Sequence, residues 1–238
     1  MKNVLFLFIS FLGFLYSKAQ TADDIIKKWT NAMGGGEKLA SIKSVYTENE
    51  LNIMNNPASG KTYILNGKGF KSEIDLSGQT IIDCYTVNAG WSINPLAGQP
   101  TAVNMPEGQI KLGQLSFDAS GPLYNYGSKG SKVELLGKED LKGSSAYKIK
   151  LTSAAGTEVV YFINDSSYYI MQSVAKMNVN GQDIEITTAL SDYRKTAEGY
   201  IMPYASELDF PGLTIGFTNK KIEVNKEIDP AIFVMPKN

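Results

Sequence analysis

Residues Val159–Met171, with the sequence VVYFINDSSYYIM, decide the fold class. Asn164-Asp165-Ser166-Ser167 separates two apolar runs, and because these residue types favour tight turns, the segment predicts an antiparallel hairpin. A hairpin with one face in water normally alternates apolar and polar residues. The run VVYFI at 159–163 is instead apolar on both faces. Both faces must therefore be covered, either in a closed core or beside a cavity.

The composition excludes several kinds of chemistry. The chain of 238 residues contains no histidine, which rules out a Ser-His-Asp triad, a Cys-His pair and a His-ligated zinc. A formal net charge of -1 argues against nucleic acid or an anionic membrane surface as the main partner, since both require a basic patch. The one cysteine, Cys84, lies in the strand-like run TIIDCYTV, where a small buried apolar role is favoured over that of a nucleophile. We expect no metal and no cofactor.

The N-terminus predicts an export signal. Lys2, an apolar run from Val4 to Tyr16 and the small-residue motif Ser17-Lys18-Ala19 are typical of a cleaved secretory signal peptide. The run is shorter than the roughly 20 apolar residues that a membrane-spanning helix needs, and no later run is longer. The sequence thus predicts a signal peptide at 1–19 and a single mature domain at 20–238 without a transmembrane segment. Its predicted location is the periplasm, with secretion as the alternative.

The mature chain begins with a helix and continues with strands. Ile25, Ile26, Trp29 and Met33 recur at helical spacing, Thr21 is suited to cap the helix, and Gly34-Gly35-Gly36 ends it, with a short helical turn at Glu37–Ser41. From Val45 onward the period changes to two, and turn signals such as Asn66-Gly67 and Ser77-Gly78 indicate a meander. The predicted strands are Val45–Met54, Lys61–Leu65, Phe70–Leu76, Thr80–Val87, Gly90–Asn94, Lys132–Lys138, Ser145–Thr152, Glu158–Asn164, Tyr168–Val179, Asp183–Arg194, Tyr200–Phe210, Thr214–Thr218 and Lys221–Val224. Residues 99–130 interrupt the alternation and predict a loop with a short helix, which is usually functional at this length.

The width of the predicted sheet favours an enclosed space. About ten or more strands at roughly 4.8 Å spacing give a sheet nearly 50 Å wide, whereas a helix is about 10–12 Å across. Two helices cannot cover that width, so the sheet must curl, and a curled sheet of this size leaves an interior that its own side chains need not fill. The sequence therefore predicts a mainly β architecture with a strongly curved antiparallel sheet and an apolar cavity.

Several segments also resemble a known family. GPLYNYGSKGSKVELLGKEDLKGSSAYKIKL (Gly121–Leu151), GTEVVYFINDSSYYIMQS, SDYRKTAEGYIMPY and IEVNKEIDPAIFVMP resemble the periplasmic outer-membrane lipoprotein-sorting (LolA-like) proteins, closest to the group found in Bacteroidota. The resemblance implies a half-barrel closed by helices over a cavity that takes lipoprotein acyl chains or other lipids, and partner proteins in the inner and outer membranes. In such carriers an interior arginine anchors the lid. The only arginine here, Arg194, lies beside a turn and does not match that role.

The alternation of each strand predicts which side chains face the cavity. We expect the apolar strand faces to line it, represented by Phe70, Ile74, Trp91, Ile93, Ile149, Leu151, Tyr161, Ile163 and Met171. The lid over the open side is predicted to come from the N-terminal helix and the central segment, through Ile25, Ile26, Trp29, Met33, Ile110, Leu112, Leu115 and Phe117.

Three functions compete at this point. A non-enzymatic carrier or binding protein for lipid chains needs only an apolar cavity, because burying each methylene contributes about 0.8 kcal/mol. An envelope scaffold or interaction protein would have a packed core instead. A secreted hydrolase would need an acidic pair such as Glu48 and Glu50, but a solvated strand face explains these two residues better.

Overall fold

The computed structural model describes residues 20–179 and 182–237. The predicted signal peptide at 1–19 lies outside the described residues, and within them no helix is long and apolar enough to cross a bilayer. The strands are β1 Ser44–Ile53, β2 Asn56–Leu65, β3 Gly69–Leu76, β4 Gln79–Thr86, β5 Gly90–Asn94, β6 Gln99–Asn104, β7 Lys132–Leu141, β8 Ser144–Thr152, β9 Glu158–Asn164, β10 Ile170–Val179, β11 Gln182–Lys195, β12 Ile201–Phe210 and β13 Leu213–Val224. The helices are α1 Ala22–Ala32, α2 Gly36–Ala40 and α3 Glu107–Gly113, with 3-10 turns η1 Pro95–Ala97, η2 Gln114–Phe117, η3 Tyr126–Lys129 and η4 Pro230–Phe233.

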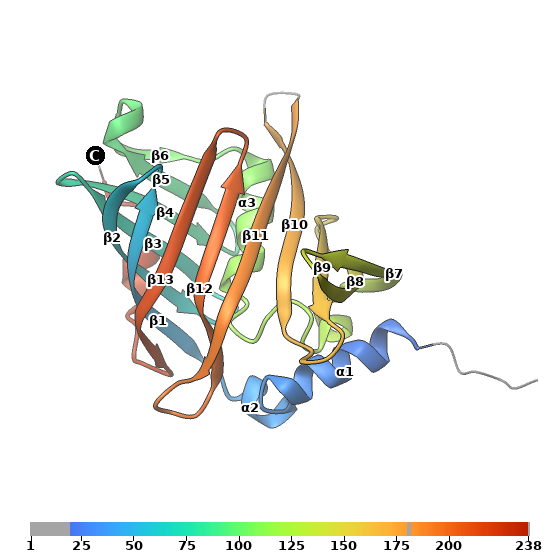
Figure 1. Cartoon of the computed structure of the whole chain (residues 1–238). Helices are drawn as coiled ribbons and strands as arrows, with labels where there is room; N and C mark the ends of the chain where they lie inside the picture. The colour runs from blue at the N-terminus through green and yellow to red at the C-terminus, as the bar shows by residue number, and fades with distance from the viewer. Residues whose placement is uncertain (1–19, 180–181, 238) are drawn as a thin grey trace, which may run out of the picture.

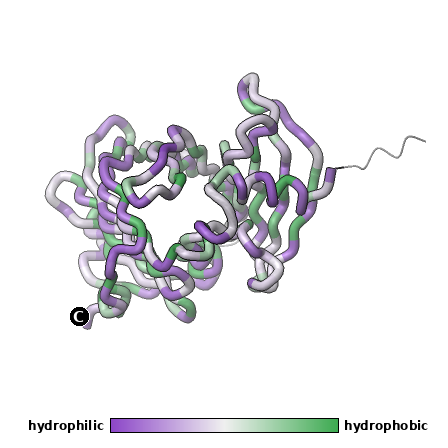
Figure 2. The backbone as a smooth tube through the Cα atoms, turned by 90° about the horizontal axis from the view of Figure 1, so that it is seen from below, coloured by the Kyte–Doolittle hydropathy of each residue, from purple (hydrophilic) through white to green (hydrophobic). Residues whose placement is uncertain are grey.

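All thirteen strands form one antiparallel sheet, which confirms the predicted mainly β, curved architecture. The order is β6-β5-β4-β3-β2-β1-β13-β12-β11-β10-β9-β8-β7. Consecutive strands pair with each other except for β6 and β7, and β1 also pairs with β13 in the middle of the sheet. Seen from below, the backbone bends round in a deep curve instead of forming a flat layer (Figure 2).

This topology fixes the path of the chain between β6 and β7. The two strands are consecutive in sequence but lie at opposite edges of the sheet. Residues 105–131 must therefore travel from one edge to the other, and they do so on the concave side, where α3 lies in Figure 1. We call residues 105–131 the crossing segment. The long loop with a short helix predicted from the sequence is this connection.

Two strand predictions were wrong. Residues 99–104, QPTAVN, form β6, an edge strand, although Pro100 argues against a strand in the sequence. Proline is tolerated at an edge because no partner needs its missing N–H. Residues 214–218 and 221–224 are one strand, β13. A bulge opposite Glu48 and Asn49 absorbs Lys220 without ending the strand, although the polar run Asn219–Lys221 resembles a turn.

Helix α1 begins and ends as the sequence predicts. The side-chain oxygen of Thr21 accepts a hydrogen bond from the backbone N–H of Asp24 at 3.2 Å, and the Asp24 carboxylate accepts one from the backbone N–H of Thr21 at 3.0 Å. This reciprocal pair satisfies donors that a helix start leaves free. The buried face of α1, through Ile25, Ile26 and Trp29, joins the main hydrophobic core.

The hairpin at Val159–Met171 is closed on both faces. On the concave side, Tyr161 and Ile163 belong to the core that α1 completes. On the convex side, Phe162 is 6% exposed and the Lys148 ammonium lies 5.5 Å from its ring centre. The turn forms as predicted, since the Asn164 side-chain oxygen accepts hydrogen bonds from the backbone N–H groups of Ser166 (3.0 Å) and Ser167 (2.8 Å). The hairpin is therefore part of a closed core at this end of the sheet.

Replacement of Ile149 tests that closed core. The side chain is 0% exposed, so Ile149→Ala should leave a cavity and reduce the free energy of unfolding by about 2–5 kcal/mol in urea titrations. Leu136→Ala on the neighbouring strand β7 is the control, because Leu136 is 44% exposed and its loss should change the free energy by no more than about 0.5 kcal/mol. A loss at Ile149 as small as at Leu136 would mean that this end of the sheet is hollow.

Candidate ligand-binding groove

A groove of about 490 Å³ lies on the concave face, beneath the crossing segment. Strands β2, β3 and β4 form one wall, β9 to β13 form the other, and α3 with η2 lie across it. Its size falls in the range of small-molecule sites, roughly 300–1,000 Å³. The large apolar side chains that line it are Phe70, Ile74, Leu112, Leu115, Val159, Ile186, Leu208, Phe210, Ile215 and Phe217.

The predicted lining residues divide between the groove and the core. Phe70, Ile74 and Tyr161 line the groove. Ile149, Leu151 and Ile163 are in the core cluster with α1 and are 0% exposed, so they stabilise the fold and do not line the groove. Met171 is half-buried at the start of β10 and touches Asn164 instead, through a contact of 3.5 Å between its sulfur and the amide nitrogen.

The placement of Trp91 and Ile93 in the cavity was wrong. Trp91 pairs with Cys84, which pairs with Lys71, so the three side chains share the face opposite to Phe70. Trp91 and Ile93 lie on this convex face in a second hydrophobic cluster that the C-terminal segment covers. The indole N–H of Trp91 donates a hydrogen bond to the carbonyl oxygen of Phe233 at 3.0 Å. The convex face of β5 is therefore apolar because the C-terminal segment packs on it, a contact that the alternation of residues alone does not reveal.

The residues of the predicted lid also fall into two groups. Leu112 and Leu115, in the crossing segment, line the groove, and Phe117 is 8% exposed and lines an adjoining hollow of about 610 Å³. Ile25, Ile26 and Trp29 of α1 and Met33, which caps its C-terminal end, belong to the core cluster and line neither space. The cover of the groove is thus the crossing segment, and α1 closes the core beside it.

Two glycines seat α3 on the sheet. A Cβ atom on Gly113 would overlap the ring of Tyr85 on β4, and one on Gly90 of β5 would lie 2.8 Å from Cγ1 of Ile110. The absence of side chains at these two positions allows the close approach of helix and strands. Gln109 on α3 donates a hydrogen bond to the Tyr85 hydroxyl at 3.4 Å. Burial raises the pKa of Tyr85 to about 12, so its hydroxyl stays protonated at neutral pH.

The groove also contains polar groups that the sequence reasoning missed. Thr62, Ser72 and Asp83 line it on β2, β3 and β4. Burial raises the pKa of the Asp83 carboxyl above its ordinary value. A signal was present in the sequence, because Asp83 stands two residues from Tyr85 and from Ile81 on the apolar face of TIIDCYTV.

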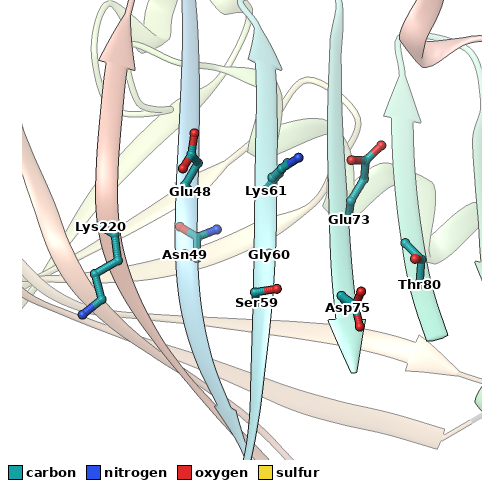
Figure 3. A pocket seen from close by; sticks show the side chains of 9 residues that line it. All are labelled: Glu48, Asn49, Ser59, Gly60, Lys61, Glu73, Asp75, Thr80 and Lys220. Carbon is teal, nitrogen blue, oxygen red and sulfur yellow. The ribbon is translucent and has the colours of Figure 1, made fainter. Parts of the chain in front are cut away.

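The convex face holds a different, charged hollow of about 390 Å³. Figure 3 shows Glu48, Lys61 and Glu73 in a row on β1, β2 and β3, and the register pairs Lys61 with both glutamates. Glu48 also lies 3.9 Å from Lys221, and Glu50 lies 2.7 Å from Lys220. The alternating charges neutralise each other at an exposed surface, as expected of a solvated strand face. The acidic pair considered for a hydrolase is part of this surface.

Cys84 and Arg194 lie outside the groove. Cys84 is 0% exposed beneath the C-terminal segment, and burial raises the pKa of its thiol to about 12, which leaves no thiolate for chemistry at neutral pH. The Arg194 guanidinium forms two hydrogen bonds with the carboxylate of Asp192, at 2.7 and 2.5 Å, on the surface. Among the described residues, no cluster of three or more Cys, Asp or Glu side chains could hold a metal ion.

Comparisons with known proteins place the fold. No protein-family model and no curated protein sequence matches the chain. A DUF1329 family protein from Desulfovibrio piger is similar in structure, with a TM-score of 0.58 and 13% identity over 91% of this chain and 98% of that one. A LolA superfamily protein from Nitrosomonas europaea has a TM-score of 0.57 and 14% identity over 91% of this chain and 98% of that one. A structure described as an outer membrane lipoprotein-sorting protein domain from Vibrio parahaemolyticus has a TM-score of 0.53 and 11% identity, covering 88% and 94%.

These likenesses confirm the LolA-like fold that the sequence resemblance implied. At identities of 11–14% they concern the fold alone. The grouping with Bacteroidota stays a prediction.

The Gly113→Ala variant tests how α3 is seated. The added methyl group overlaps the Tyr85 ring, so α3 must shift off β4, at a cost of about 1–3 kcal/mol in the free energy of unfolding. Amide hydrogen exchange in residues 105–117 should become faster. Gly127→Ala is the matched control in the same segment, because a Cβ there meets nothing within 4 Å. Unchanged exchange in Gly113→Ala would show that the close approach does not hold the segment in place.

Proposed function

We propose that the protein is a non-enzymatic carrier or binding protein for the apolar chain of a lipid, which it holds in the groove beneath the crossing segment. The observation that carries the proposal is a groove of about 490 Å³ with large apolar side chains on both walls and on the segment above it. Such a lining gives water little to bind and offers an alkyl chain many contacts.

The energetics of an alkyl chain suit this site. Each buried methylene contributes about 0.8 kcal/mol, so ten of them give about 8 kcal/mol before the costs of association are subtracted. That corresponds to dissociation constants near or weaker than about 1 µM. Binding in this range is reversible, as a carrier requires. No polar chemistry is needed to hold the chain itself.

In this proposal the crossing segment moves when a ligand enters the groove. Leu112 and Leu115 line the groove, and Leu115 and Pro122 line both the groove and the adjoining hollow of about 610 Å³. Displacement of these side chains would therefore join the two spaces into a longer trough. A covering segment that opens on binding is common among ligand-binding proteins. In this proposal α1 stays in place as part of the core.

The cellular setting follows from the predicted signal peptide at 1–19. A mature protein that begins at Gln20 would act as one domain in the periplasm, or outside the cell if it is secreted. There its ligands would be lipoprotein acyl chains or other lipids. Donor and acceptor proteins in the inner and outer membranes would complete a transport route.

A scaffold function is the second candidate, and one observation favours it. Three of the predicted cavity residues, Ile149, Leu151 and Ile163, are fully buried in a closed core together with α1. If the groove stayed empty in the cell, the curved sheet would serve only to present its convex surface. The co-purification of a ligand distinguishes the two functions.

The carrier proposal predicts a bound lipid. Native mass spectra of the exported protein should show an excess mass that disappears after extraction with organic solvent. Ile74→Gln places an amide on the groove wall and should lower the loaded fraction, since an unpaired buried amide costs about 1–3 kcal/mol. Leu96→Gln is the control because Leu96 is 53% exposed, and its loaded fraction should equal that of the wild type. A wild-type protein that carries no extra mass, and after extraction binds neither the neutral probe N-phenyl-1-naphthylamine nor dodecanol, contradicts the carrier function.

A further inference from the structure

One wall of the groove carries a row of polar side chains. Thr62 pairs with Ser72 across β2 and β3, and Ser72 pairs with Asp83 across β3 and β4. All three line the groove. Residues directly opposite each other on antiparallel strands have Cβ atoms about 4.5–5.5 Å apart, so the three side chains form one continuous row.

Apolar rows flank this polar row on both sides. Phe70 pairs with Tyr85 on one side, with ring centres 5.9 Å apart, and Ile74 pairs with Ile81 on the other. Across the groove, β12 and β13 present Leu208 and Phe217, again without charge. The wall is therefore amphipathic, with a narrow strip of hydroxyl and carboxylate groups between apolar rows. The other polar side chains that line the groove, Gln109, Ser116, Ser173 and Thr188, are uncharged, so among the described residues Asp83 is the one carboxylate in its lining.

Asp83 lacks a partner in this position. Among the described residues, no hydrogen bond or ion pair joins its carboxylate to another group, and burial alone raises its pKa. Two carboxylates of the convex face differ in this respect: Glu73 lies 2.8 Å from Lys71, and Glu48 accepts a hydrogen bond from the Tyr46 hydroxyl at 3.0 Å. The carboxylate inside the groove has no such partner.

An unpaired carboxylate in an apolar site is costly, and a bound cation removes that cost. An ammonium group has three N–H donors, and the directly opposed Asp83 and Ser72 offer the carboxylate oxygens and a hydroxyl oxygen as acceptors, with Thr62 one strand further along the row. A carboxylate head group would instead meet a like charge. A neutral hydroxylated head could bond to the row but would leave the charge of Asp83 unbalanced.

From these contacts we propose that the groove selects a single-chain amphiphile with a cationic amine head group. The ammonium lies against Asp83 and Ser72, which are directly opposite each other, and the alkyl chain lies between the crossing segment and the apolar side chains of β12 and β13. The proposal rests on the proposed lipid-binding function and adds the class of head group to it. It names Asp83 as the residue that determines specificity.

Displacement of a neutral fluorescent probe, N-phenyl-1-naphthylamine, from the delipidated protein tests this selectivity. Dodecylammonium, dodecanol and dodecanoate share one chain and differ only in the head group. We expect dodecylammonium to bind at least about tenfold more tightly than dodecanol, and dodecanoate to bind most weakly. In Asp83→Asn the preference for the amine should disappear while the affinity for dodecanol stays within about twofold. Near-UV circular dichroism of each complex shows whether the protein remains folded.

Asp75→Asn is the matched control. It makes the same change on the convex face, where Asp75 lines the charged hollow, and the preference for the amine should persist. Ser72→Ala removes one acceptor and leaves the charge, so it should weaken dodecylammonium binding less than Asp83→Asn does. This second variant tests the row even if Asp83→Asn folds poorly.

The pH dependence of binding gives an independent readout. A protonated Asp83 cannot pair with an ammonium group, so the affinity for dodecylammonium should fall as the pH is lowered through the raised pKa of Asp83. The other titratable groups that line the groove are the phenols of Tyr85 and Tyr161, whose pKa values burial raises further above neutral pH. They do not titrate in this range. Dodecanol binding should not change with pH, and neither should dodecylammonium binding to Asp83→Asn.

The outcomes separate this inference from the function on which it rests. If all three chains bind equally and Asp83→Asn changes nothing, the groove binds lipid without selecting a cation, and the inference is overturned while the carrier function stands. Tighter binding of dodecanol than of dodecylammonium overturns it as well and points to a neutral hydroxylated head. If no chain displaces the probe and no lipid co-purifies, the proposed function itself fails, and this inference fails with it.

Discussion

The pairing of β1 with β13 is the constraint on which the rest of the structure depends. It joins the first and last strands in the middle of the sheet, so the two edges belong to β6 and β7, which are consecutive in sequence. The connection between them has to run from one edge to the other, and it does so over the concave face. The cover of the groove is therefore a consequence of strand order, and its side chains, such as Leu112 and Leu115, determine how well it fits.

The same topology gives the two ends of the sheet different interiors. At the end formed by β7, β8 and β9, α1 lies against the concave face and closes it with Ile25 and Trp29, which are 0% and 3% exposed. Among the described residues, no helix closes the middle of the concave face in this way, and the short α3 approaches β4 and β5, near the opposite edge, over two glycines. The sheet thus contains both a packed core and a groove. The choice between core and cavity that the apolar hairpin at 159–171 raises therefore has a different answer in different parts of the sheet.

Much of the strand arrangement follows from the sequence alone, and the incorrect placements of side chains have physical causes. Alternation in β3 places Phe70 and Ile74 on the concave face, where they line the groove, because side chains of this strand meet water on one side only. In β9 both faces are apolar, so alternation alone did not decide which face of the strand carries Tyr161. It failed for Trp91, because the C-terminal segment makes the convex face of β5 apolar as well, and that cover is a long-range contact. Alternation also could not show that Ile149 lies outside the groove, since the contact with α1 that covers it is a tertiary contact. Asp83 was overlooked because one polar residue in an apolar strand resembles an ordinary exposed position.

The central claim is that an alkyl chain occupies the concave groove beneath the crossing segment. Photocrosslinking with an alkyl chain that carries a diazirine and a neutral head group, followed by mass-spectrometric mapping, tests it most directly. The structure predicts label on the groove-lining residues of β3, β12 and β13 and on Leu112 or Leu115 of the crossing segment, with competition by an unlabelled chain. Label confined to the convex face, or spread over the surface without competition, would contradict the claim.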